Sequence, residues 1–267
     1  MANKPHILLT NDDGILSPGL WAAAGALAQL GFVTVAAPRE QSSGAGRSLP
    51  ATSDGIIRAE TVQVRGQEWQ VYAVGGTPAQ AVLHAVLEIM PEKPDMVVAG
   101  INYGENVTTA ITSSGTVGAV LEAASMGIPA VAVSLETLHD QHLSYSTAVD
   151  FSSAAHFTHL FSRLLMARGL PEGVDLLKVD VPSDATPATA WEWTRLSRRR
   201  YYQPTRPSRS SWEVPGTIGY ELVADLATEP EGTDIHCLLK KRLVSVTPLT
   251  LDLSASVPAA TLETFFR

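Results

Sequence analysis

The chain has 267 residues, a formal net charge of −8 and a single cysteine, Cys237. The acidic balance argues against binding long nucleic acid, and a lone cysteine excludes an intramolecular disulfide. The first twenty residues lack the pattern of a signal peptide, and no apolar run reaches the length of a membrane span. We therefore expect a cytoplasmic protein with no membrane contact.

Strand-like and helix-like segments alternate through the first half of the chain. The sequence predicts a hairpin over 56–74 with Gly66 in its turn. Alternation of this kind implies right-handed crossovers and a parallel sheet that is covered on both faces. Residues 1–190 are thus expected to form a Rossmann-like, doubly wound α/β core. Strands are expected at 7–9, 32–37, 94–101, 130–133 and 176–181, and helices at 20–30, 78–89, 117–126 and 146–166.

Residues 191–267 have a different pattern. Segments 191–202, 235–239 and 243–247 read as strands, 203–208 reads as an exposed loop, and no helical pattern intervenes. We expect an antiparallel β-rich arm or hairpin that belongs to the same single domain. Tyr201, Tyr202 and Trp212 lie in a part of this arm that has few other core-forming residues, and their burial against another subunit is the simplest account.

Two adjacent carboxylates, Asp12 and Asp13, directly follow the first apolar strand. Ligands of open α/β sheets bind at the carboxyl ends of the strands, and two neighbouring carboxylates repel each other unless a cation lies between them. The alternative is an ordinary helix cap or turn, for which Asp and Asn are also favoured.

Three loops, 11–14, 42–46 and 102–106, each follow a predicted strand and should meet at this edge of the sheet. Together they supply only oxygen donors, which select Mg²⁺, Mn²⁺ or Ca²⁺ over zinc or copper. Considered one at a time, the serines also fit a flexible loop and Asn102 fits a turn. The donors are Asp12, Asp13, Ser42 or Ser43, Asn102 and Asn106.

A fourth loop, Ser113–Thr116, immediately precedes the helix predicted at 117–126. Free N–H groups at a helix start attract anions, although Ser114 also fits a simple N-cap. A cation beside an anion-binding helix start suits metal-assisted hydrolysis of a phosphate ester. No histidine is found near these loops in the sequence, so the sequence assigns no general acid.

Five motifs follow one another in the first 135 residues: Thr10–Gly14, Ala37–Pro38 with Ser43–Gly44, Gly76–Pro78, Gly100–Asn106 and Ser114–Val117. In this order and spacing they resemble the SurE survival-protein family of 5′/3′-nucleotidases. A C-terminal segment, 245–249 with Asp252, is also similar to that family. One departure is the strand 176–181, where Lys178 and Asp180 replace the usual asparagines.

The resemblance implies a divalent-metal-dependent phosphomonoesterase that hydrolyses nucleoside 5′- and 3′-monophosphates. It implies one metal ion per subunit, Mg²⁺ or Mn²⁺ (Ca²⁺ could replace it in a crystal), held by Asp12, Asp13, Ser43 and Asn102. It places substrate contacts at Asn106, Ser114, Gly115 and Thr116, and catalytic roles at Asp12, Asp13 and Asn106. It also implies a homodimer or homotetramer with an exchanged C-terminal arm. An exopolyphosphatase with incidental nucleotidase activity and a non-catalytic nucleotide-binding regulator remain the alternatives.

Overall fold

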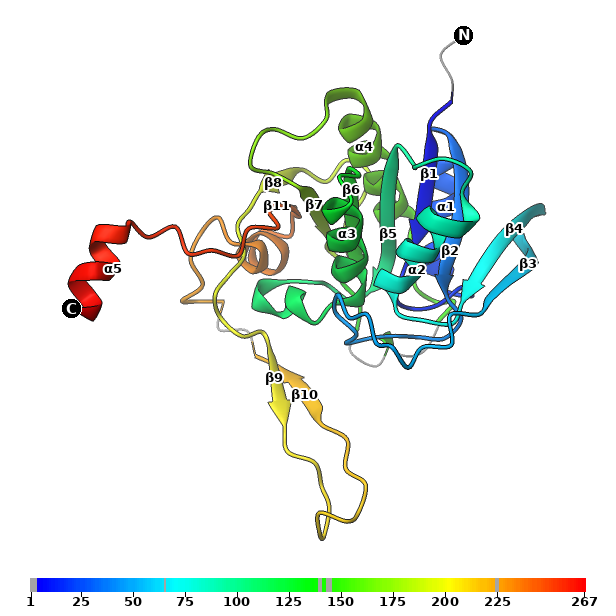
Figure 1. Cartoon of the computed structure of the whole chain (residues 1–267). Helices are drawn as coiled ribbons and strands as arrows, with labels where there is room; N and C mark the ends of the chain where they lie inside the picture. The colour runs from blue at the N-terminus through cyan, green and yellow to red at the C-terminus, as the bar shows by residue number, and fades with distance from the viewer. Residues whose placement is uncertain (1–3, 65, 139–140, 143–145, 224–225) are drawn as a thin grey trace.

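A nine-stranded sheet forms the centre of the computed structural model (Figure 1), which describes residues 4–64, 66–138, 141–142, 146–223 and 226–267. Its first six strands in spatial order are β3 (Ile57–Val64), β4 (Gln67–Val74), β2 (Phe32–Pro38), β1 (His6–Thr10), β5 (Met96–Tyr103) and β6 (Ala130–Leu135), followed by β7 (Leu176–Val181). All of these neighbours pair in parallel except β3 and β4, which form the expected hairpin. The predicted doubly wound α/β fold is confirmed.

Helices cover both faces of the sheet, so the central strands are buried on both sides. Every residue of β6 and of β7 is buried, including the polar Ser134 of β6 and the charged Lys178 and Asp180 of β7. On one face lie α1 (Pro18–Leu27) and α4 (Ser152–Arg168), and on the other lie α2 (Pro78–His84), a π-helical turn η1 (Ala85–Ile89) and α3 (Gly115–Ser125).

Local sequence signals explain where α2 and α3 begin. Thr77 and Gln80 form a capping box ahead of Pro78, the first residue of α2. Ser114 caps α3 by accepting the Val117 N–H at 3.1 Å. Both helices therefore begin where the sequence predicts, within two residues.

The winding direction of the sheet reverses between β1 and β5, which is where open α/β sheets commonly bind ligands. The chain winds outward from β1 to β2 and β4, then crosses back to β5 and winds the other way to β6 and β7. Crevices open at the carboxyl ends of strands where the winding direction reverses. Asp12 and Asp13 follow β1, and Asn102 lies at the end of β5, so the predicted donors lie at this reversal.

The segment beyond residue 190 is divided between the main sheet and a separate hairpin. β11 (Val244–Leu249) pairs antiparallel to β7, and β8 (Trp191–Trp193) pairs with β11, which completes the nine-stranded sheet. β9 (Tyr202–Thr205) and β10 (Gly219–Leu222) form a two-stranded antiparallel hairpin that extends away from the body of the protein (Figure 1). The fold thus contains the expected antiparallel hairpin.

Several local predictions in this segment are wrong. The strand expected over 191–202 is interrupted after β8. The Thr194 N–H still donates to the Val246 carbonyl of β11, but Arg195 pairs with the loop before Asp234, and Tyr202 belongs to β9. Part of the loop expected at 203–208 belongs to β9. The strand expected at 235–239 is a π-helical turn, η4 (His236–Lys240), because a short, mostly apolar run fits both periodicities.

The helices near residues 150 and 260 also differ from expectation. α4 begins at Ser152 rather than 146 and ends at Arg168 rather than 166. α5 (Ala259–Phe266), which has no predicted counterpart, projects from the body with all of its residues exposed (Figure 1). No helix in the described ranges combines the length and apolarity that a membrane crossing requires.

Candidate active site

Asp12 and Asp13 occupy a tight turn at the end of β1. The Asn11 side chain donates to the Gly14 carbonyl at 3.0 Å and accepts the Gly14 N–H at 3.2 Å. Gly14 adopts a φ of +94°, which glycine reaches without a steric penalty. This turn holds both carboxylates in the interior, where the exposed fractions are 4% for Asp12 and 1% for Asp13.

The start of α3 lies directly against Asp12. The Thr116 hydroxyl donates to Asp12 Oδ1. A side chain at Gly115 would place its Cβ 2.6 Å from the Asp12 Cβ, so only glycine allows this approach. The predicted substrate-contact segment Gly115–Thr116 is therefore already in contact with a predicted metal ligand.

Asp13 is held from two other elements. Its Oδ2 accepts the Tyr103 N–H from β5 at 3.2 Å, and its Oδ1 accepts from the Gln41 side chain at 3.3 Å. Gln41 precedes the serine loop that the sequence predicts to join the site. Gln41 has no place in the sequence prediction, since nothing in a loop sequence indicates which side chain reaches a carboxylate.

Asn102 joins the same cluster through Thr116. The Asn102 Nδ2 donates to the carbonyls of Tyr103 and Gly104 at 3.0 and 2.7 Å, which fixes the amide. Its Oδ1 accepts from the Thr116 hydroxyl at 3.3 Å, so one hydroxyl links Asn102 to Asp12. Side chains from β1, β5 and α3 are thus brought together as oxygen donors.

The serine loop is fastened to this cluster through its backbone. The Ser42 N–H donates to the Asp12 carbonyl at 2.7 Å, and the Gly46 N–H donates to the Ser113 carbonyl at 3.0 Å. Ser43, the predicted ligand, is exposed one residue beyond Ser42. The structure therefore brings the Ser43 loop to the site without burying the Ser43 side chain.

Burial makes the charges on Asp12 and Asp13 costly. Burial raises the pKa of Asp12 above its ordinary value, although hydrogen bonds from Thr116 and Gly115 counteract part of this. Burial, together with the negative charge of Asp12, raises the pKa of Asp13 well above its ordinary value. In the part of the chain that the structure describes, Asp12 forms no ion pair. A cation is the kind of ligand that would offset both effects.

The donor set fits a hard divalent cation. It combines two carboxylates with an amide oxygen and hydroxyl oxygens, the ligand types that Mg²⁺ and Mn²⁺ prefer. No group of three or more His, Cys, Asp and Glu side chains in the described residues is arranged to hold a metal. The candidate site therefore depends on Asn102 and on Ser43 in addition to Asp12 and Asp13.

The other predicted substrate contacts have structural partners of their own. The Ser114 hydroxyl accepts the Val117 N–H as a helix cap, as the alternative interpretation expects. The Asn106 N–H donates to Asp180 Oδ1 at 2.8 Å, and its side chain donates to Ser134 Oγ at 2.8 Å. Contact of these residues with a phosphate group stays a prediction.

One histidine lies close to the site, contrary to the expectation from the sequence. A Cβ added to Gly104 would lie 2.6 Å from the Nε2 of His142, so the ring packs against the Asn102–Gly104 turn. The His142 carbonyl accepts from Gln41 at 3.0 Å, and its Nδ1 lies 3.0 Å from the Tyr220 hydroxyl. The sequence gives no sign of this, because His142 follows β6 in a separate loop.

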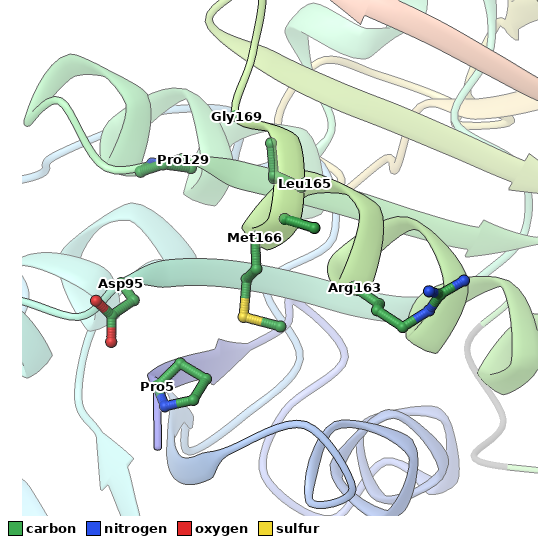
Figure 2. Close-up of a pocket in the computed structure, with 8 residues that line it drawn as sticks. Pro5, Asp95, Pro129, Arg163, Leu165, Met166 and Gly169 are labelled. Atoms are coloured by element: carbon green, nitrogen blue, oxygen red, sulfur yellow. The ribbon is translucent and has the colours of Figure 1, made fainter. Parts of the chain in front are cut away.

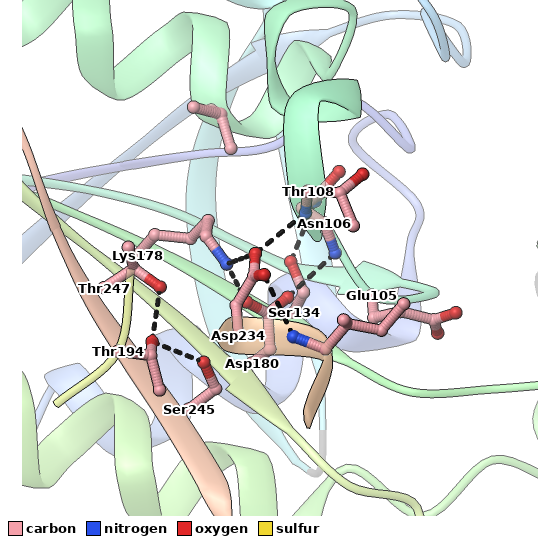
Figure 3. A network of polar contacts seen from close by, with 12 residues as sticks. Glu105, Asn106, Thr108, Ser134, Lys178, Asp180, Thr194, Asp234, Ser245 and Thr247 are labelled. Carbon is pink, nitrogen blue, oxygen red and sulfur yellow. Dashed lines mark hydrogen bonds and ion pairs between the residues drawn. The ribbon is translucent and has the colours of Figure 1, made fainter. Parts of the chain in front are cut away.

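A buried polar network lies behind the Asn106 loop (Figure 3). The Lys178 ammonium contacts the carboxylates of Asp180 and Asp234, and none of the three side chains is exposed. In the sequence, Lys178 and Asp180 stand out only as departures from a family pattern. Their contact with each other and with Asp234 requires the pairing of strands far apart in the chain.

Glu105 is a second buried carboxyl beside this loop, with an exposed fraction of 3%. Burial and the nearby carboxylates of Glu136 and Asp180 raise its pKa to about 7, despite opposing hydrogen bonds that include one from Tyr201. The Tyr202 hydroxyl donates to the Glu105 carbonyl at 2.7 Å. The base of the β9–β10 hairpin therefore rests on the loop that follows β5.

A surface pocket of about 490 Å³ lies at the opposite edge of the sheet (Figure 2). Its lining includes Pro5, Asp95 and Pro129, which precede β1, β5 and β6, and the end of α4. The Asp95 carboxylate accepts the His6 N–H at 2.7 Å. This pocket is remote from the donor cluster, since it opens at the amino ends of the strands.

A smaller pocket of about 310 Å³ adjoins the donor cluster. Gln41 and Ser42 line it, and the same two residues hydrogen-bond to Asp13 and Asp12. The rest of its lining is mostly polar and includes Arg39, Asp54 and Thr77. The pocket therefore adjoins residues that hold Asp12 and Asp13, although neither carboxylate lines it.

Comparison with known protein families gives one match, which covers most of the chain. The model of the family described as survival protein SurE matches residues 7–203. The matched range contains Asp12, Asp13, Ser43, Asn102, Asn106 and Ser114–Thr116.

Individual relatives are similar over nearly the whole chain. A protein of Methanocella arvoryzae named 5′-nucleotidase SurE is 41% identical, with 98% of each chain covered. A protein of the same name from Thermococcus gammatolerans is 46% identical, with 94% of this chain and 92% of the relative covered. The crystal structure of the SurE protein from Aquifex aeolicus superimposes with a TM-score of 0.74 at 30% identity and covers 98% of this chain and 99% of that chain.

The raised pKa of Glu105 predicts a loss of stability with rising pH. Between the ordinary pKa of 4.5 and the folded-state pKa of about 7, the folded chain holds a proton that the unfolded chain releases. The stabilisation is complete below pH 4.5 and is lost as the pH rises through about 7. As the pH rises from 5 to 8, the free energy of unfolding of the wild type should fall by roughly 2 to 3 kcal/mol relative to that of Glu105→Gln, whose side chain does not titrate.

Urea unfolding of both proteins at the two pH values measures this difference. Glu172→Gln is the control, because Glu172 is exposed and should show no such gain. If the free energies of unfolding of Glu105→Gln and the wild type differ by the same amount at pH 5 and at pH 8, the burial of a protonated Glu105 is contradicted.

Proposed function

The chain belongs to the SurE family, and on that premise we propose that it is a divalent-metal-dependent phosphomonoesterase that hydrolyses nucleoside 5′- and 3′-monophosphates. The observation that carries the proposal is the pair of adjacent buried carboxylates, Asp12 and Asp13, at the reversal of strand order. The names of the relatives from Methanocella arvoryzae and Thermococcus gammatolerans support the 5′ activity. Extension to 3′-monophosphates is our expectation from the family resemblance.

The metal ion would be held by Asp12, Asp13, Asn102 and Ser43. When bound, it would supply a positive charge that polarises a phosphate oxygen and lowers the pKa of a bound water. Hydrogen bonds already orient both carboxylates for this ligand. Asp12 accepts from the Thr116 hydroxyl, and Asp13 accepts from the Tyr103 N–H and the Gln41 side chain. These contacts keep the carboxylates oriented at the cost of mutual repulsion.

The phosphate group of the substrate would be bound by the loop after β5 and the start of α3. Free N–H groups and the helix dipole favour an anion at this helix start, and the Asn106 amide can donate to a phosphate oxygen. Donors fixed in place before the reaction stabilise the charge that develops in the transition state. The Ser114 cap and the bond between Asn106 and Ser134 supply that fixation.

The nucleoside part of the substrate would enter the 310 Å³ pocket beside Gln41 and Ser42. The position of this pocket supports a nucleotide over inorganic phosphate alone, because its lining is continuous with groups that hold Asp12 and Asp13. Polar side chains such as Arg39, Asp54 and Thr77 suit a ribose and a base edge.

The test is hydrolysis of AMP, 3′-AMP and p-nitrophenyl phosphate by the full chain. EDTA should abolish phosphate release from all three, and Mg²⁺ or Mn²⁺ should restore it. Asp13→Asn, which keeps the shape and removes one ligand charge, should lower turnover at least about a hundredfold, comparable to losing a key electrostatic contact. Glu172→Gln, far from the donor cluster in an exposed loop, is the matched control and should remain fully active.

Each alternative function has its own outcome in this assay. Faster phosphate release from polyphosphate than from any nucleotide would favour an exopolyphosphatase. Nucleotide binding without turnover at any metal concentration would favour a regulator. Full activity of a metal-free sample, or of Asp13→Asn, would contradict the proposed metal site.

We also propose that the chain forms at least a homodimer through the β9–β10 hairpin. The hairpin carries exposed apolar side chains well away from the body, with exposed fractions of 88% for Trp212 and 69% for Ile218. The sequence predicts that Tyr201 and Tyr202 are buried against another subunit. Instead they pack within the chain against Val107, Ile235 and Leu238, so they are not part of this exposed surface. The argument therefore rests on the outer part of the hairpin.

A double substitution, Trp212→Ser with Ile218→Ser, should shift the assembly toward monomers without loss of the fold. Light scattering at micromolar concentration measures the mass of the wild type and of the variant. Leu87→Ser is the control, because Leu87 is 71% exposed on a different part of the surface. A monomeric wild type would refute this role of the hairpin and leave the proposed metal site unaffected.

A further inference from the structure

Lys178 and Asp180 form a fully buried ion pair on one face of β7. They are two residues apart on the strand, so their side chains share a face, and neither is exposed. The Lys178 ammonium contacts the Asp180 carboxylate and lies 3.4 Å from Asp234 Oδ2 (Figure 3). A buried charge must be paired and hydrogen-bonded to be tolerated, so the remaining partners of the two carboxylates are informative.

Both carboxylates hold the loop that follows β5. Asp180 Oδ1 accepts the Asn106 N–H at 2.8 Å, and Asp234 Oδ2 accepts the Thr108 N–H at 2.8 Å. The backbone N–H groups of Asn106 and Thr108 therefore depend on two carboxylates that the Lys178 ammonium keeps close to each other. The Asn106 side chain is fixed in addition by its 2.8 Å bond to Ser134 Oγ.

Thr108 shows that the loop is under constraint. Its φ is +61°, a left-handed conformation that a β-branched residue rarely adopts. Such a conformation persists only where the surrounding structure determines it. The hydrogen bond from the Thr108 N–H to Asp234 and the burial of the neighbouring Val107 hold Thr108 in this conformation.

Lys178 supplies the positive charge that faces the carboxylates of Asp180 and Asp234. Burial alone would lower the pKa of Lys178, but the Asp180 and Asp234 carboxylates raise it above the ordinary value, so Lys178 is an ammonium at neutral pH. One cation then faces two anions. Loss of Lys178 alone would leave two carboxylates buried side by side, whereas loss of both Lys178 and the Asp180 charge would restore the original net charge.

We propose that Lys178 and Asp180 are positioning residues that hold the Asn106 loop in the geometry needed to bind the phosphate group of the substrate. This inference rests on the proposed function, in which Asn106 contacts phosphate. It adds two residues that touch neither substrate nor metal and that act through the backbone of the loop. It also connects the loop to the C-terminal segment, since Asp234 Oδ1 accepts the Ser197 N–H at 2.9 Å.

The experiment compares Lys178→Met, Asp180→Asn and the double variant in the full chain. Three quantities are measured for each: KM for AMP, the inhibition constant of inorganic phosphate, and the hydrogen-exchange protection of the Asn106 and Thr108 amides. The affinity for Mn²⁺ is measured in parallel, because the proposed ligands Asp12 and Asp13 lie outside this cluster. Leu165→Ala is the control for destabilisation, since Leu165 is buried in α4 away from the loop.

Lys178→Met should raise the KM and the phosphate inhibition constant roughly tenfold or more, as expected for a displaced binding group. The two amides should lose protection, and Mn²⁺ affinity should stay within about twofold. The double variant should recover part of the phosphate affinity that Lys178→Met loses, because its net charge matches the wild type. Leu165→Ala should lower the melting temperature and leave KM and phosphate inhibition unchanged.

Unchanged KM, phosphate inhibition and amide protection in a folded Lys178→Met would overturn the proposal, as would changes no larger than those of Leu165→Ala at the same loss of melting temperature. If Lys178→Met does not fold, Asp180→Asn and the double variant supply the same comparison. Failure of the proposed function is a separate result: the wild type would then not hydrolyse AMP, while amide protection would still report whether the pair holds the loop.

Discussion

The structure depends on the burial of two adjacent carboxylates at the end of the central strand β1. Asp12 and Asp13 repel each other, and burial raises the pKa of both. Separate elements hold them despite this cost: Thr116 of α3 donates to Asp12, and Tyr103 of β5 donates to Asp13. The close approach of α3 in turn requires that residue 115 be glycine. An arrangement that keeps two charges in an unfavourable place suits a site whose ligand is a cation.

The sequence predicts the core of this arrangement well. Most of the buried strands are largely apolar runs, and the Thr77 and Ser114 caps with Pro18 and Pro78 indicate where helices begin. Because parallel strands end at a common edge, position after a strand is enough to group Asp12, Asp13 and Asn102. For the same reason, the wide separation of these residues in the chain does not hinder the prediction.

The sequence does not predict contacts between distant parts of the chain, or the type of a segment whose hydrophobic pattern fits both a helix and a strand. Gln41 and His142 reach the site from loops, whose paths depend on tertiary contacts rather than on local preference. Lys178, Asp180 and Asp234 meet only after β11 and the turn before η4 pack against β7. The strand expected at 235–239 is helical because a short, mostly buried run of residues satisfies both periods.

Calorimetric titration of Mn²⁺ into the metal-free full chain tests the central claim most directly, because it measures the cation site without reference to catalysis. The account predicts binding of one ion per chain and loss of that binding in Asp13→Asn. Since the substitution removes a repelling charge, the variant should retain the fold with an unchanged or higher melting temperature. Absence of binding up to millimolar Mn²⁺, or equal binding by the wild type and a folded Asp13→Asn, would contradict the account.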